Sequence, residues 1–169
     1  MQGTRFLWQA VACQPLRTAT ITHTPSGTRR RSWREVGERV PRLAAALRAR
    51  GVADGAFVAA LGVNSDRYVE LFFAVPWAGG AFAPLNIRWS VAENQYALTD
   101  SKAAILFVDE HFVEQARELK LKLAWLKTLV YMGEGATPQG MVDYEALVAG
   151  HEPMLDAKRR GEDLWVIFY

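Results

Sequence analysis

From Phe57 onward, short apolar runs alternate along the chain with stretches in which apolar residues recur at helical spacing. The run FVAALGV at residues 57–63 is continuously apolar, as expected of a strand buried on both faces of a sheet. Strands separated by helices predict right-handed crossovers, and therefore an α/β fold in which a parallel sheet carries helices on both faces. We expect its five strands at residues 57–63, 81–86, 103–109, 128–133 and 164–169.

The stretches between these strands are predicted to be helical. In SDRYVELFFAVPWAGG, apolar residues fall at i, i+3, i+4 and i+7 from Tyr68, and Pro76 should kink or end the helix. Ser90 and Glu93 have the spacing of a capping box, in which each side chain reaches a backbone N–H at the start of a helix. The predicted helices of this part cover residues 65–80, 90–101, 110–126 and 141–150.

A different pattern precedes residue 52. Apolar residues at helical spacing predict a short helix over Arg5–Cys13, and the alternating stretches around the Pro-Ser-Gly turn of residues 25–27 predict a hairpin. A capping box at Ser32 and Glu35 then opens a helix that should end at Gly51 with a positive φ. We therefore divide the chain into residues 1–51, a leading helix, hairpin and capped helix, and residues 52–169, a five-stranded α/β subdomain.

Composition excludes several classes of protein. The net charge of +2 is too small to indicate a nucleic-acid partner, and the basic run TRRRSWR at residues 28–34 is interpreted as a solvated face. One cysteine, Cys13, allows no intramolecular disulfide, and the three histidines have no metal-ligand spacing. No window is apolar enough for a membrane span or a signal peptide, so we expect a cytoplasmic protein.

Candidate chemistry is sought at the strand ends, because an open parallel sheet binds ligands beyond the carboxyl ends of its strands. Asn64, Ser65 and Asp66 follow the first strand and could bind a ligand, but helix capping is the favoured interpretation. Asn86 and Arg88 follow the second strand and are interpreted as turn residues. The loop GEGATPQG at residues 133–140 lacks the spacing of a phosphate loop. Residues and motifs thus indicate an α/β domain and name no reaction.

The order of these signals resembles the N-terminal region of the AMP-forming acyl-CoA synthetases, in the adenylate-forming ligase superfamily. The landmarks are LAAALRARGV, the strand that leads into Asn64, AGGAFAPLN, and the helix that starts at Ser90 and is followed by DSKAAILFVDE. PLNIRWSVAENQYALTDS is most similar to the branch that ligates fatty acids and aryl acids to CoA. Two features depart from the family: Ala56 in ADGAF, where Gly-Asp is common, and Pro76 within a helix that is usually continuous.

The resemblance implies a ligase that forms an acyl-adenylate and pyrophosphate from a carboxylic acid and ATP, and then transfers the acyl group to coenzyme A. It also implies Mg²⁺, and a Thr/Ser/Gly-rich phosphate loop directly after a strand such as DLWVIFY, so that the chain would end just before this loop. We accordingly assign no catalytic, cofactor-binding or metal residue within the 169 residues, expect no ATP, Mg²⁺ or coenzyme A site in them, and expect them to be inactive alone.

Three further expectations follow from the resemblance. Residues 1–51 would pack on a second sheet that this sequence lacks, and the surface left uncovered would favour self-association. The large side chains Trp77, Phe82 and Trp89 are interpreted as core rather than as an acyl pocket, so the acid is not named. The alternatives are a stand-alone, non-catalytic α/β binding module, and an adenylating enzyme whose acceptor is a carrier-protein thiol.

Overall fold

A five-stranded parallel sheet forms the centre of the molecule, as predicted. The computed structural model describes residues 3–169. The strand order is β4-β3-β5-β6-β7, and each neighbouring pair is parallel. The strands are β3 (Phe57–Leu61), β4 (Ala81–Pro84), β5 (Ile105–Val108), β6 (Thr128–Tyr131) and β7 (Val142–Asp143).

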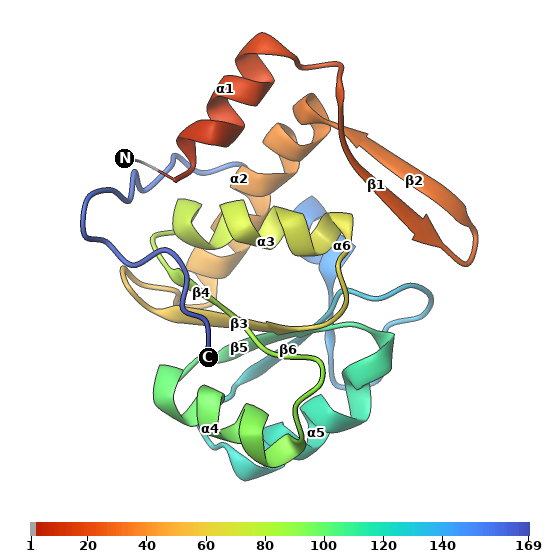
Figure 1. Cartoon of the computed structure of the whole chain (residues 1–169), viewed down its shortest axis with the longest axis vertical. Coiled ribbons are helices and arrows are strands. Elements are labelled where there is room, and N and C mark those ends of the chain that lie inside the picture. Colours follow the sequence, from red (N-terminus) through yellow and green to blue (C-terminus); the bar gives the residue numbers. More distant parts are fainter. Residues whose placement is uncertain (1–2) are drawn as a thin grey trace.

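Helices cover both faces of this sheet (Figure 1). On one face lie α2 (Trp33–Ala49), α3 (Asp66–Trp77) and α6 (Tyr144–Ala149), whose apolar side chains share a buried cluster with Val58, Phe82 and Phe107 of the strands. On the other face α4 (Val91–Ser101) and α5 (Val113–Lys122), the latter preceded by a 3-10 helix at Glu110–Phe112, enclose a second cluster. The fold is therefore the three-layered α/β arrangement expected from the alternating pattern.

The N-terminal elements also match the prediction. They are α1 (Arg5–Cys13) and the hairpin of β1 (Thr18–Thr24) and β2 (Gly27–Ser32), which pair in antiparallel register. Gly51 has the expected positive φ of 86° after the end of α2. Four side chains of α2, Val36, Val40, Leu43 and Leu47, are fully buried in the cluster beneath α3. Thus α2 shares its core with the central sheet, while the division at residue 51 and the packing on a second sheet stay predictions.

Capping boxes fix the starts of two helices. At α2 the Glu35 N–H donates to Ser32 Oγ and the Ser32 N–H donates to Glu35 Oε2, and Ser90 and Glu93 repeat this arrangement at α4. At α3 the cap is Ser65, whose hydroxyl accepts from the Tyr68 N–H. The helix ends at Trp77, one residue beyond Pro76, as the proline predicts.

Replacement of Ser32 by alanine is expected to lower the free energy of unfolding by about 1 kcal/mol, because an N-H at the start of α2 loses its acceptor. Urea denaturation followed by circular dichroism measures this loss. Ser26→Ala, an exposed substitution in the hairpin turn, is the control and should change stability by less than about 0.5 kcal/mol. Equal effects of the two substitutions would contradict the capping role.

The predicted fifth strand at residues 164–169 is wrong. This segment runs beside β4 but forms a single parallel bridge, between Phe82 and Val166, with the Phe82 N–H donating to Trp165 O and the Ile167 N–H to Phe82 O. The next bond of a parallel ladder would need an N–H at position 84, and Pro84 has none. Pairing therefore stops after one bridge.

The fifth strand is instead β7, within the segment predicted as part of a helix from residue 141. Val142 and Asp143 pair with Val130 and Tyr131, and α6 starts only at Tyr144. Two residues are too few to show an alternating pattern, so the sequence carries no periodic signal for this strand. Among the described residues, no helix combines the length and apolar character that a membrane crossing requires.

Candidate functional site at the carboxyl edge of the sheet

The loops that follow β3, β4, β5 and β6 meet at one edge of the sheet, where an open parallel sheet places its ligand. An open depression of about 530 Å³ lies between the first two loops and is lined by Gly62, Val63, Asn64, Tyr68 and residues 85–87. A smaller hollow of about 80 Å³ separates the loops after β3, β5 and β6 from the hairpin. These two depressions make the edge the first place to look for chemistry.

Asp109 organises this edge. Its carboxylate accepts from the Val63 N–H at 2.6 Å and from the His111 N–H at 2.9 Å, and so ties the loop after β3 to the end of β5. Gly62 permits the close approach, because a Cβ there would lie 2.8 Å from Asp109 Oδ2. Burial raises the pKa of the Asp109 carboxyl. The sequence analysis missed this residue, although its position directly after a buried strand was a usable signal.

The polar residues considered after β3 have separate places in the structure. Asn64 is exposed and lines the open depression, whereas Ser65 caps α3, as favoured. Asp66 is buried, and its side chain points away from the depression into ion pairs with β2. After β4, Asn86 Oδ1 accepts from the Arg88 N–H at 3.0 Å, which is the predicted turn contact. Among the described residues, the polar side chains that line the depression are therefore Asn64, Asn86 and Tyr68.

The interpretation of residues 28–34 as a solvated face is wrong for two arginines. Arg29 and Arg31 of β2 both contact the Asp66 carboxylate, at 2.7 Å each. Although burial alone would raise the pKa of Asp66, hydrogen bonds from the two guanidinium groups hold it well below its usual range. Arg30 and Arg34 are exposed, as predicted. Alternation along β2 explains why Arg30 differs from Arg29 and Arg31, because one face of the strand turns toward α3, and Arg34 already lies in α2.

The contacts of Asp66 belong to a larger charge network of four arginines and four carboxylates. Arg39 of α2 contacts Glu70 at 2.7 Å and Glu145 at 2.8 Å, and Arg67 contacts Glu145 at 2.9 Å. The members of the charge network are Arg29, Arg31, Arg39, Arg67, Asp66, Glu70, Glu134 and Glu145. The network joins the hairpin, α2, α3, the loop after β6, and α6, and its charges balance.

Tyr144 closes the network from within the core. Its hydroxyl donates to Glu70 Oε2 at 2.7 Å, and the guanidinium groups of Arg39 and Arg67 lie 5.9 and 5.7 Å from its ring centre. Burial, together with the neighbouring Glu70 charge, raises the pKa of Tyr144 well above its usual value. A neutral phenol and fully paired charges indicate a structural connection between elements rather than a reactive group.

The loop of residues 133–140 and its neighbours do not fit a triphosphate. Glu134 projects from this loop to Arg29 and Arg67, and the adjoining hollow is also lined by Asp109 and Glu110. Carboxylates repel phosphate oxygens, and the nearby guanidinium groups are already paired. Within residues 3–169, no three His, Cys, Asp or Glu side chains are grouped so that they could hold a metal ion.

The large aromatic residues lie as predicted. Trp77 and Phe82 are buried in the cluster beneath α3, and Trp89 packs against the cluster on the opposite face. Phe82 contacts Tyr68 and Phe72 in edge-to-face geometry. Tyr68 alone of these lines the open depression, and burial raises the pKa of its hydroxyl to about 12.

Comparison with known proteins finds one enzyme family and several CoA ligases that are similar to this chain. Residues 7–169 match the family described as AMP-binding enzyme. The chain is 38% identical over 117 residues to an indoleacetate–CoA ligase of Aromatoleum aromaticum, a match that covers 69% of this chain and 22% of the relative. It is 31% identical to acetate–CoA ligase CCL3 of Humulus lupulus, over 95% of this chain and 30% of the relative.

Solved structures show the same fold. The anthranilate CoA ligase AuaEII, in complex with anthranoyl-AMP, matches 98% of this chain with a TM-score of 0.88 at 23% identity, over 31% of its own length. The chain thus spans less than a third of the length of these relatives. Because the family match covers nearly all of the described residues, the chain belongs to the AMP-binding enzyme family, and its relatives are acyl-CoA ligases.

Proposed function

We propose that this chain is the N-terminal part of an AMP-forming ligase that joins an aryl or fatty acid to coenzyme A. The observation that carries the proposal is the family match over residues 7–169, together with relatives named for their acids. These include an indoleacetate–CoA ligase, a feruloyl-CoA synthase from Amycolatopsis, and a long-chain-fatty-acid–CoA ligase from Thermus thermophilus. The first two are named for aryl acids and the third for a fatty acid, whereas the Humulus lupulus relative is named for acetate. We choose an aryl or fatty acid because the stretch PLNIRWSVAENQYALTDS is most similar to that branch.

We expect the chemistry to need groups from outside residues 3–169. A carboxylate is a poor electrophile, so the family activates it as an acyl-adenylate before the thiol of coenzyme A attacks, and positive groups must stabilise the charge on phosphorus. Here the arginines nearest the carboxyl edge are paired with Asp66, Glu70, Glu134 and Glu145. We therefore propose that this part supplies the scaffold, with Asp109 shaping the edge, and that ATP, Mg²⁺ and coenzyme A are held by other parts of the complete enzyme.

The 169-residue chain is accordingly expected to give no ATP–pyrophosphate exchange above background with indoleacetate, ferulate, benzoate or palmitate. Incorporation of labelled pyrophosphate into ATP measures adenylation directly, before any acyl acceptor is needed. A folded sample, established by circular dichroism and cooperative urea unfolding, makes a blank result meaningful. Exchange that rises with the concentration of one acid would contradict the assignment of the chemistry to other parts.

The ligase proposal itself is tested on a protein in which this chain is joined to the part of a relative, such as the indoleacetate–CoA ligase, that follows the matching residues. Acid-dependent formation of AMP and of the acyl-CoA, detected by mass spectrometry, is the expected result. AMP formation without an acyl-CoA product, but with transfer to a carrier protein, would replace the proposal with a different acceptor. A well-folded fusion that forms no adenylate with any of the four acids would overturn it.

A further inference from the structure

A pocket of about 330 Å³ lies at the amino edge of the sheet, opposite the carboxyl edge. It is lined by the starts of β3 and β5 and by the residues that end α2 and α4. Gly51 and Gly55 leave one side open, because a Cβ at either position would meet no atom within 4 Å. The pocket is therefore separate from the edge at which an open parallel sheet places its ligand.

Arg50, which follows α2 and lines the pocket, has two donor nitrogens without a partner. Its Nη1–H donates to Ala46 O at 3.1 Å and so serves the end of the helix. Within the described structure its Nε and Nη2 have no hydrogen-bond partner, and neither is among the buried polar atoms that lack one. These two nitrogens are thus accessible, and two donors of one planar guanidinium match two oxygens of an anion.

No carboxylate pairs with Arg50. Among residues 3–169, none lies within ion-pair distance of Arg50, Lys102 or Lys127. Partial burial lowers the pKa of Arg50, whereas the hydrogen bond to Asp66 raises the pKa of Arg29. The opposite directions agree with a guanidinium that is partly removed from water and has no anion beside it.

Two lysines add positive charge on the β5 side of the pocket. Lys102 is one of the lining residues, and its ammonium lies over the Trp125 ring, 3.9 Å from the ring centre. Lys127 adjoins the lining residue Ala104, because its backbone N–H donates to Ala104 O at 2.9 Å. Both lysine side chains are exposed. They are therefore open to an anion that approaches this edge.

Two carboxylates are adjacent in sequence to lining residues, and each has another partner. Asp54 contacts Arg48 at 2.5 Å, and Asp100 accepts from the Tyr169 hydroxyl at 2.9 Å. Neither lines the pocket. Even with both counted, the surroundings keep an excess of two positive charges, because the cations number four: Arg48, Arg50, Lys102 and Lys127.

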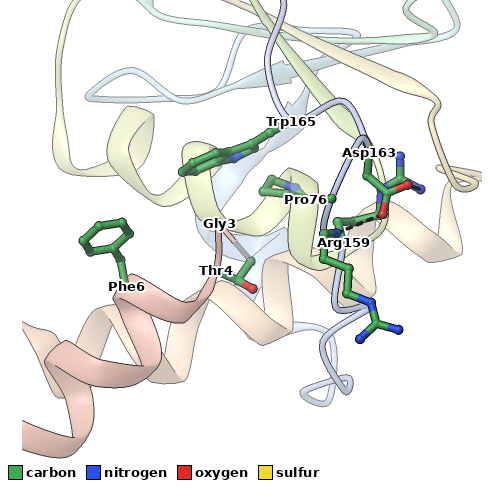
Figure 2. A pocket seen from close by; sticks show the side chains of 9 residues that line it. Gly3, Thr4, Phe6, Pro76, Arg159, Asp163 and Trp165 are labelled. Carbon is green, nitrogen blue, oxygen red and sulfur yellow. Dashed lines mark hydrogen bonds and ion pairs between the residues drawn. The ribbon is translucent and has the colours of Figure 1, made fainter. Parts of the chain in front are cut away.

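The cavity beside the C-terminal segment does not have such an excess (Figure 2). Figure 2 shows Arg159 next to Asp163, and its Nη1 contacts that carboxylate at 3.3 Å while its Nε is buried. Arg160 donates its backbone N–H to the same carboxylate, and Asp156 accepts from the Thr4 hydroxyl at 2.7 Å. Two arginines thus face two carboxylates there, so the amino-edge pocket is better suited to an anion.

We propose that the amino-edge pocket binds the phosphate group of a small phosphate monoester. Such a group carries about −1.5 to −2 charges at neutral pH, which matches the excess positive charge. Two phosphate oxygens would accept from Arg50 Nε and Nη2, and Lys102 supplies a second positive charge nearby. The organic part would lie against Val52, Phe57 and Ile105. The volume is at the lower end of the roughly 300–1,000 Å³ of ligand pockets, which suits a single-ring ester. This inference does not rest on the proposed ligase function.

Isothermal titration calorimetry of the 169-residue chain with phenyl phosphate tests the proposal. We expect saturable binding of phenyl phosphate, weaker binding of inorganic phosphate, which lacks the apolar body, and none of phenol, which lacks the charge. Arg50→Gln should weaken binding of phenyl phosphate about 10- to 100-fold, as expected for the loss of hydrogen bonds to a charged group. Arg30→Gln removes an equal charge from an exposed position on β2 and should leave affinity unchanged.

A second measurement locates the ligand. The indole N–H resonance of Trp125, whose ring lies beneath the Lys102 ammonium, should shift in proportion to occupancy. The resonance of Trp165, which donates to Phe72 O on the opposite face of the sheet, should not shift. The two resonances are assigned with Trp125→Phe and Trp165→Phe.

If Arg50→Gln does not fold, Lys102→Gln takes its place, because this exposed side chain has no carboxylate partner within residues 3–169. Its removal should weaken binding about 2- to 5-fold, as expected for an exposed charge. Absence of saturable binding, equal affinity for phenol or for inorganic phosphate, equal loss in Arg30→Gln, or a shift of Trp165 without one of Trp125 would each overturn the proposal.

Discussion

Replacement of Asp66 by asparagine is expected to lower the free energy of unfolding by about 3–5 kcal/mol. The Asp66 side chain is fully buried and accepts from both Arg29 and Arg31. An uncharged amide of the same shape leaves these two guanidinium groups partly buried with too little negative charge, and it turns an N–H₂ group toward donors. Because both arginines belong to β2, the hairpin should lose its connection to α3 first.

Urea denaturation at pH 7 measures this loss, and Glu114→Gln is the matched control. Glu114 also pairs with an arginine, Arg117, at 2.6 Å, but its side chain is 82% exposed, so its removal should cost less than about 1 kcal/mol. Similar losses for the two substitutions would mean that the buried ion pairs of Asp66 stabilise the fold no more than an exposed pair. This result would contradict the proposal that the charge network connects the elements structurally.

The dependence of the free energy of unfolding on pH is a second test of the Asp66 ion pairs. The pKa of Asp66 in the folded protein lies below its ordinary value of 3.8. The stabilisation that its carboxylate gives the folded protein is therefore complete above pH 3.8, and it is lost as the pH falls through the pKa of the folded protein. The parent chain should therefore lose stability between about pH 4 and pH 2 more steeply than Asp66→Asn, which has no carboxyl to protonate at this position. Parallel curves for the two proteins would show that other carboxylates carry the acid sensitivity.

Periodic segments explain how much of the fold was predictable. The strands β3 to β6 and the helices α2 to α4 carry long apolar patterns or capping boxes, and each lies within a few residues of its predicted position. The prediction from sequence failed where the structure of a segment depends on the neighbouring strand and not on a periodic pattern within the segment. β7 has two residues and forms because β6 offers an edge, while residues 164–169 look like a strand but meet Pro84. Neither outcome is encoded within the segment itself.

The carboxyl edge was less predictable for a related reason. The sequence places Asn64, Ser65, Asp66 and Asp109 near strand ends, but it does not show which of them turns into the core. The burial of Asp66 depends on Arg29 and Arg31, which lie more than thirty residues earlier in the chain. A basic run on a hairpin is usually solvated, and only the packing of β2 near α3 reveals that alternate arginines are paired.

Replacement of Phe82 by alanine is expected to cost about 3–5 kcal/mol, the usual range for a buried phenylalanine. Phe82 is fully buried in β4 and contacts Tyr68 and Phe72 edge to face, at 5.7 and 4.8 Å between ring centres. Its backbone also anchors the C-terminal segment through Trp165 and Ile167, and alanine keeps both of these bonds. The loss should thus report the core beneath α3 and not detachment of that segment.

Phe168→Ala separates these two effects, because Phe168 lies on the same C-terminal segment and is 70% exposed. Its loss should change stability by less than about 0.5 kcal/mol in urea denaturation, and Phe82→Ala should leave the Trp165 indole resonance near its parent position. A small effect of Phe82→Ala would contradict a stabilising role of this side chain in the core. A Trp165 resonance that moves to its unfolded position would show that the substitution detaches the C-terminal segment. The expected pattern places the stabilising contact between α3 and the sheet, where Tyr68 also reaches the carboxyl edge.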